Sequence, residues 1–246
     1  MVHTLLGLGL TAMTTSPLGA TGIVQQFVGR AYSDSGQLLY EEHHSLRGQC
    51  IDGLWKPSIH EVSYRRPGPG EPFASKTLHY SQSLLRPEMT FNQPLWQEQW
   101  QIRFDDEDVR ITLRAKSRQP EEFNLKPTPD MVFDAGFDHL VRQSWGQLRD
   151  GKPVEFQFLA PTRGRSYEFL LEPDQASEGN GGLKLVIRPN GLLTRLLVPP
   201  IELAYNQRGF LTRFSGLTNI RKNADTNFTA DIRYDSVESP KCPLIP

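Results

Sequence analysis

The sequence predicts a mainly β (α+β) protein, a strongly curved or partly closed antiparallel sheet with one main helix packed on it. Three observations carry this prediction. Several segments alternate apolar and polar residues with a period of two, which is typical of half-buried strands. One segment instead repeats its apolar residues with the period of a helix. The 20 glycines and 19 prolines are spread along the 246 residues, as in chains built of many short elements joined by turns.

A β-hairpin is the clearest of the predicted elements. Residues 100–104 and 109–113 each place their apolar side chains on one face, and the acidic run 105–108 separates them. Two alternating runs around a short polar stretch are typical of a hairpin. We expect the four acidic side chains to form a solvated turn, which requires no metal ion.

Further strands are predicted along most of the chain. The regular ones cover residues 154–158, 167–171, 183–187 and 228–234. The less regular ones cover residues 24–32, 38–46, 59–64 and 76–80. An apolar run at 193–205 is broken by two prolines, which confine it to two pieces or to an edge. A turn at 206–209 then leads into residues 210–214.

One amphipathic helix is predicted over residues 134–149. Its apolar residues fall on one side, while Asp138, His139, Arg142 and Gln143 fall on the other, which we expect to face solvent. Asp134 is expected to cap its start, and Gly151 lies just past its end. Three further stretches, residues 66–72, 117–129 and 173–182, are predicted to be loops from their proline, glycine and polar content.

The N-terminus predicts an exported protein. Residues 5–13 form an apolar run too short for a transmembrane helix, and Ala20 suits the position before a signal-peptidase cut. We expect a signal peptide over residues 1–20 and one β-rich domain over 21–246, with 117–130 as a candidate sub-boundary. Only His3 precedes the run where a basic residue is usual, so a mature strand, a frayed end or a misplaced start are the alternatives. The expected location is the periplasm of a Gram-negative bacterium, or another exported compartment.

Charge and cysteine content limit the classes of partner that the sequence supports. Lys and Arg total 27 and Asp and Glu total 28, a balance that gives no support to nucleic-acid binding. No segment is apolar for the length of a transmembrane helix. Cys50 and Cys242 either pair in an oxidising compartment or remain two independent thiols, because spacing alone does not decide. No cofactor motif or catalytic motif is present, so no cofactor and no catalytic residue is predicted.

The C-terminal half carries a family resemblance. Residues 134–141 lead into Trp145 and then 148–156, and Tyr205 and residues 213–220 follow. Over roughly residues 130–235 this pattern resembles an exported proteobacterial family known as domain of unknown function 3108. The resemblance implies a curved, β-rich periplasmic protein, in some cases an open half-barrel that carries lipoproteins or acyl chains. It supplies no catalytic residues.

The strongest metal-like pattern is the run from Glu41 to His44. Alternation along a strand puts Glu42 and His44 on one face, where they could begin a metal site completed by His60 or His79. A solvated strand with polar cross-strand pairs explains the same residues, and it is the favoured interpretation because exposed strand faces are normally polar.

Two further pairs are candidate ligand contacts. Trp96 and Trp100, four residues apart, are expected to share a face and to form either a sugar or lipid platform or ordinary core. Arg163 and Arg165 lie in a predicted turn, where they either hold a phosphate or carboxylate or are simply solvated.

Three functions follow as hypotheses. The first is a periplasmic protein that binds or carries an apolar, lipid-like ligand, and an empty apolar concavity between sheet and helix would support it. The second is a structural or assembly protein of the cell envelope, with an envelope protein as partner. The third is a hydrolase, which ranks lowest because the GxSxG and SxxK nucleophile motifs are absent.

Overall fold

A computed structural model describes residues 23–116, 118–174, 181–191 and 199–246. The predicted leader, residues 1–20, therefore lies outside the described residues. The described chain is built mainly of strands: β1 (Ile23–Tyr32), β2 (Leu38–Ile51), β3 (Leu54–Arg65), β4 (Ala74–His79), β5 (Glu88–Gln93), β6 (Glu98–Asp105), β7 (Asp108–Ala115), β8 (Arg118–Leu125), β9 (Met131–Val132), β10 (Val154–Ala160), β11 (Arg165–Pro173), β12 (Leu183–Pro189), β13 (Ile201–Tyr205), β14 (Leu211–Arg221) and β15 (Asn227–Glu238). Its helices are α1 (Gly136–Gln143) and α2 (Trp145–Arg149), and its 3-10 turns are η1 (Pro94–Trp96) and η2 (Pro161–Arg163).

All of these strands belong to one open sheet. Its order is β8-β7-β6-β5-β4-β3-β2-β1-β15-β14-β13-β12-β11-β10-β9, so β8 and β9 are its edges. Every pairing is antiparallel except the short parallel pair β9–β10. Every pairing joins strands that are consecutive in the sequence, except that of β1 with β15, which joins the two ends of the described chain. The mainly β, antiparallel fold class predicted from alternation is confirmed.

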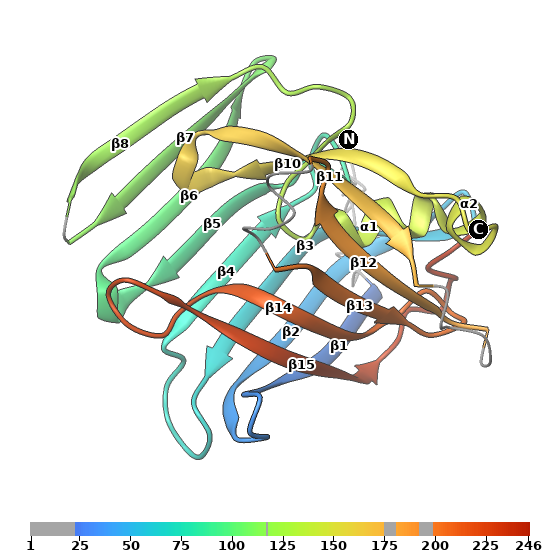
Figure 1. Cartoon of the computed structure of the whole chain (residues 1–246), viewed down its shortest axis with the longest axis horizontal. Coiled ribbons are helices and arrows are strands. Elements are labelled where there is room, and N and C mark those ends of the chain that lie inside the picture. The colour runs from blue at the N-terminus through green and yellow to red at the C-terminus, as the bar shows by residue number, and fades with distance from the viewer. Residues whose placement is uncertain (1–22, 117, 175–180, 192–198) are drawn as a thin grey trace, which may run out of the picture.

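The sheet curls until its two halves face each other. Figure 1 shows β10–β13 passing in front of β1–β4, with α1 drawn between them. The turn at the end of η2 contacts the far part of the sheet, because η2 packs against β7 and Gly164 lies against the ring of Phe123 on β8. Gly164 has a φ of 60°, and a Cβ there would lie 2.2 Å from Phe123 Cγ, so only glycine fits this approach.

The predicted helix forms as two shorter ones. The chain breaks at Ser144 between α1 and α2, and Gly151, at a φ of 77°, follows the second helix as expected. Asp134 does not cap α1, whose N-cap is Ala135, because the Asp134 carboxylate is turned toward the sheet. The predicted polar face is exposed at Gln143, but His139 and Arg142 are buried, since the curled sheet surrounds α1 on both sides.

Two apolar clusters fill the interior. The larger joins β2–β7 to β14 and β15, and includes Tyr40, Phe91 and Ile102. The smaller packs α1 and α2 on β10–β13, and includes Trp145, Leu148 and Phe156. The cores therefore lie inside the curl of the sheet, on either side of α1.

The loop predictions have mixed outcomes. Residues 66–72 form no strand or helix, as expected, and most of 173–182 lies outside the described residues. The loop predicted over 117–129 is wrong, because residues 118–125 form the edge strand β8 and residue 117 lies outside the described residues. An edge strand tolerates Pro120 and many charged side chains because one of its sides pairs with no strand.

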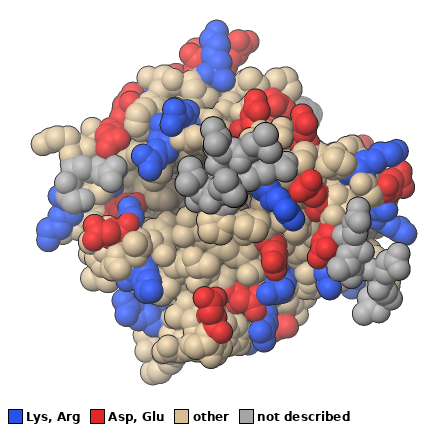
Figure 2. Space-filling view, in the orientation of Figure 1, with Lys and Arg blue, Asp and Glu red and all other residues tan. Residues whose placement is uncertain are grey.

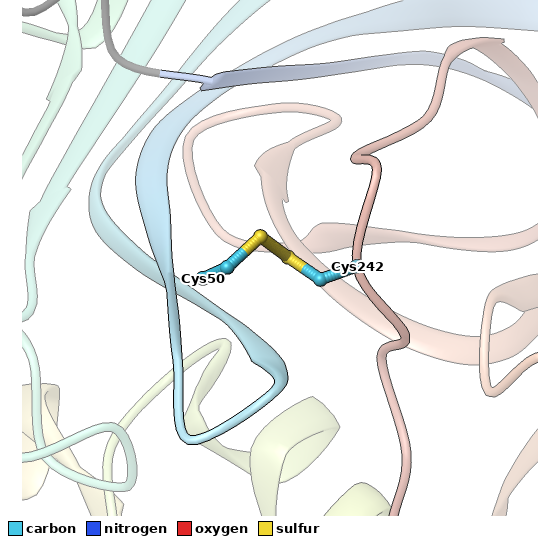
Figure 3. Close-up of a disulfide and its surroundings, with 2 residues drawn as sticks. All are labelled: Cys50 and Cys242. Atoms are coloured by element: carbon cyan, nitrogen blue, oxygen red, sulfur yellow. A yellow bond between two sulfur atoms is a disulfide. The ribbon is translucent and has the colours of Figure 1, made fainter.

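Cys50 and Cys242 form a disulfide. It links the end of β2 to the C-terminal segment, across a sequence separation of 192 residues (Figure 3). The same segment is held by a 2.8 Å hydrogen bond from the Trp55 backbone N–H to the carbonyl of Pro243. Ile245 packs against the smaller core cluster. The C-terminus is therefore tied to both halves of the curled sheet.

Candidate ligand-binding cavity

A cavity of about 230 Å³ lies inside the curl, between α1 and the two halves of the sheet. We call its two sides the polar wall and the apolar wall. The polar wall consists of seven residues from β2–β4, from α1 and from the segment before it: Glu42, His44, His60, Lys76, Asp134, Asp138 and Arg142. The apolar wall consists of eight residues from β10–β14: Phe156, Phe158, Phe169, Ile187, Ile201, Leu211, Phe214 and Leu217. Leu217 is 58% exposed, which places it at the mouth.

The polar wall follows from strand alternation. On β2, Tyr40, Glu42, His44 and Leu46 all point to the same side, so two polar residues occupy inward positions between two apolar ones. On β4, Lys76 lies in the same way between Ala74 and Leu78. The curl buries this side of the sheet, and these polar side chains are therefore buried too.

A hydrogen-bonded chain links Glu42, His44 and His60. His44 Nε2 lies 3.1 Å from Glu42 Oε2, and His44 Nδ1 lies 2.9 Å from His60 Nε2. The Tyr234 hydroxyl donates to the same Glu42 oxygen at 3.1 Å. The ring of Phe27 stacks on His44 with centroids 4.2 Å apart. Both nitrogens of His44 are thus engaged within the protein.

Two ion pairs complete the polar wall. Lys76 Nζ donates to both carboxylate oxygens of Asp134, at 2.9 and 2.8 Å, and Asn219 Nδ2 donates to the same group at 3.2 Å. On α1, Arg142 Nη2 lies 2.7 Å from Asp138 Oδ2, one helical turn earlier. Arg142 Nε also donates to the carbonyl of Gly209, at 3.0 Å, which ties α1 to the loop before β14.

Burial sets the protonation of this wall. Desolvation lowers the pKa of His60 well below its usual value, and the nearby His44, Lys76 and Arg142 lower it further, so His60 is neutral. Burial likewise lowers the pKa of His139, on α1, to about 3. Burial raises the pKa of Asp138, although the charge of Arg142 opposes that shift. The wall therefore combines the neutral imidazole of His60 with two ion pairs.

The metal interpretation of Glu42 and His44 gains no support. The structure does place them on one face, beside His60, but that face lines the cavity and is not the solvated strand we favoured, because the sheet curls over it. His44 has both ring nitrogens hydrogen-bonded, and His79 is exposed. Within the described ranges, no group of three or more His, Cys, Asp or Glu residues is arranged to hold a metal ion.

The other candidate contacts lie away from the cavity lining. Trp96 ends the turn η1, whereas Trp100 is buried in β6, where its indole N–H donates to Glu98 at 2.6 Å. They are on separate elements because Gln97, at a φ of 48°, turns the chain between them. Arg163 is exposed at the end of η2, and Arg165 packs on Tyr167 with 4.9 Å between the guanidinium carbon and the ring centroid.

Lys76, Asp134, Asp138 and Arg142 are site residues that sequence reasoning missed. Lys76 could have been found from the sequence, because it lies two residues from an apolar residue on each side and therefore shares the inward face of its strand. The pair Asp138 and Arg142 has the spacing of an ion pair on one helical face. It was assigned to solvent because nothing in the local pattern shows that the sheet surrounds the helix.

Comparisons with known proteins leave the family open. No protein-family model matches the chain, so the resemblance to domain of unknown function 3108 is not supported, and no curated protein matches it. The chain is similar to a solved β-barrel-like protein of domain of unknown function 1849 from Brucella abortus, at 10% identity and a TM-score of 0.40. That similarity covers 88% of this chain and 94% of the other, and at this TM-score it carries no inference. In the described part of the chain, no helix is long and apolar enough to cross a membrane.

Proposed function

We propose that the protein binds a small lipid-like molecule whose apolar part lies against the apolar wall. The observation that carries this proposal is the cavity between α1 and the two halves of the sheet. Ligand sites are typically concave and mostly apolar, with a few polar groups that fix orientation. At about 230 Å³ the cavity lies just below the roughly 300–1,000 Å³ of drug-sized sites, which suits one short alkyl chain better than a whole membrane lipid.

The lining favours binding over hydrolysis. The one hydroxyl of a Ser or Thr residue among the described lining residues is that of Thr218, which donates to the Phe228 carbonyl and accepts from the Ile220 N–H. A nucleophile instead needs a free hydroxyl or thiol beside a base.

We place the protein in an oxidising, exported compartment, as part of the same proposal. The disulfide between Cys50 and Cys242 supports this location, because such bonds persist mainly in periplasmic and secreted proteins. Cell fractionation of the native host, with an antibody against the protein, tests it. Recovery of the protein in the cytosolic fraction with reduced cysteines would contradict the proposed location but would leave the proposed ligand binding unaffected.

Fluorescence of the neutral apolar dye N-phenyl-1-naphthylamine tests the binding proposal. We expect the dye to brighten on binding and to be displaced by decanol. Leu217→Asp should weaken dye binding about tenfold, because it puts a charge at the mouth of the cavity. Leu95→Asp is the matched control, since Leu95 is 63% exposed on η1 and does not line the cavity. No brightening, or equal loss in both variants, would contradict the proposal.

A further inference from the structure

The two cations of the polar wall already have partners. Lys76 is bound by both oxygens of Asp134, and Arg142 is bound by Asp138 and by the Gly209 carbonyl. An anionic group entering the cavity would have to compete with carboxylates that are held at hydrogen-bond distance. The wall holds three carboxylates, those of Glu42, Asp134 and Asp138, against these two Lys and Arg cations, so it disfavours a further negative charge.

Glu42 is the carboxylate of this wall that lacks a Lys or Arg partner. Its side chain is 9% exposed, and His44 and Tyr234 both bond to Oε2. Among the described residues no hydrogen bond reaches Oε1, and this oxygen is not one of the fully buried unpartnered atoms. Because Glu42 lines the cavity, Oε1 is an acceptor that a bound molecule can reach. A buried carboxylate is stable only with donors or cations around it.

Three aromatic residues line the cavity together with this carboxylate. Phe27, Tyr64 and Tyr234 line the cavity with Glu42, and Phe27 and Tyr234 meet edge to face at 5.8 Å. Tyr64 is the cross-strand partner of Glu42, and the Tyr234 hydroxyl donates to it at 3.1 Å. Burial raises the pKa of both phenols, and the nearby Glu42 charge raises each pKa further. Aromatic faces attract cations, and cages of such rings recognise quaternary ammonium groups.

From this geometry we infer that the ligand carries a cationic ammonium head, which Glu42 Oε1 holds within the ring of Phe27, Tyr64 and Tyr234, while its alkyl chain lies on the apolar wall. The inference rests on the proposed function and adds the chemical class of the ligand. The pairs Lys76–Asp134 and Arg142–Asp138 leave Glu42 as the wall carboxylate without a Lys or Arg partner, and an ammonium group would supply that partner.

Three probes with the same ten-carbon chain test the head group: decyltrimethylammonium, decanol and decanoate. Their affinities are measured below micelle-forming concentrations, by dye displacement and by calorimetry. We expect the ammonium probe to bind at least tenfold more tightly than decanoate, with decanol between them. Decanoate binding as tightly as the ammonium probe would overturn the inference while leaving the proposed function standing. If none of the three binds, the proposed function itself fails.

Variants locate the head group. Glu42→Gln should lower the affinity for the ammonium probe at least tenfold and change the affinity for decanol less than threefold. Glu61→Gln is the control, because Glu61 lies on β3 with a half-exposed side chain outside this cavity. Phe27→Leu removes one ring without touching a charge, so it reports on the cage even if Glu42→Gln does not fold. This variant should lower the affinity for the ammonium probe several-fold and leave the affinity for decanol unchanged. Unchanged ammonium affinity in a folded Glu42→Gln protein, or in Phe27→Leu, would overturn the assignment.

Discussion

The two walls of the cavity come from opposite halves of the sheet and are stabilised in different ways. The apolar wall, from β10–β14, gains from the burial of aromatic and aliphatic side chains. The polar wall, from β2–β4 and α1, buries two ion pairs, in which each charge is tolerated because its partner is held beside it. Substitutions should therefore have graded effects on the apolar wall, whereas removing one member of a pair should be severe on the polar wall.

The largest effect is expected at the Lys76–Asp134 pair. Asp134→Asn keeps the shape of the side chain and tolerates its φ of 40°, but leaves Lys76 charged, buried and uncompensated. We expect the free energy of unfolding to fall by about 3–5 kcal/mol, measured by urea denaturation. Asp150→Asn, in a pair with both side chains about two-thirds exposed, should change it by less than about 0.5 kcal/mol.

A double variant sharpens this comparison. Lys76→Met together with Asp134→Asn removes the buried charge as well as its partner, and should recover part of the stability that Asp134→Asn loses. If the losses of unfolding free energy in Asp134→Asn and in Lys76→Met alone summed to the loss in the double variant, the stability of the polar wall would not depend on pairing. The contrast between the walls would then fail.

The disulfide should rank next, because it ties β2, a strand of the polar wall, to the segment that packs on the other cluster. Replacing Cys50 and Cys242 by serine should cost about 2–5 kcal/mol of unfolding free energy, since the cross-link closes a long loop of the unfolded chain. Urea denaturation of the wild-type protein with and without dithiothreitol should give the same difference. A double variant as stable as the oxidised protein would show that the strands alone hold the two walls together.

The smallest of these effects is a pH dependence that belongs to the helix of the polar wall. His139 has a pKa of about 3 when folded, against about 6.5 when unfolded, so the unfolded chain binds more protons between these values. Stability should therefore fall as the pH drops below about 6.5, by about 2 kcal/mol at pH 5 from this residue, and level off near pH 3. The raised pKa of Asp138 acts the other way, because its folded carboxyl gains a proton first.

His139→Phe isolates this contribution. The variant keeps a ring against Tyr80, whose ring centroid lies 5.2 Å from that of His139, and removes the titrating group. Its stability should lose less between pH 7.5 and pH 5 than that of the wild-type protein. His79→Gln, at an exposed position of β4, should leave the pH dependence unchanged. If the stability of His139→Phe depended on pH as steeply as that of the wild-type protein, His139 would not contribute to the pH dependence.

Sequence patterns predicted one wall better than the other, for a physical reason. Phe156, Phe169 and Ile187 are apolar where their strands face the cavity, so alternation identified β10–β12 directly. Glu42 and His44 are polar in equally inward positions, and a pattern based on polarity assigns them to solvent. The surroundings of Arg142 were beyond such a pattern, because they depend on how the whole sheet curls around α1.

Surface charge does not distinguish the walls. Figure 2 shows Lys and Arg interspersed with Asp and Glu over the visible face, in keeping with totals of 27 and 28. Exposed pairs such as Arg47–Glu61 contribute little, since solvent screens them. The charges that matter for this fold are the few inside it.

The pairing of β1 with β15 makes the strand order of this open sheet a circular permutation of the order of the strands in the chain. From β9 through β15 and on from β1 to β8, each strand lies beside the one numbered next to it, and the pairing of Gln26 with Glu238 is the step that spans nearly the whole described chain. A circular permutant that begins in residues 126–130, ends at β8 and joins the natural termini by a linker would turn this step into a local hairpin. Its contact order would be lower, so it should fold faster than the natural chain while reaching the same sheet.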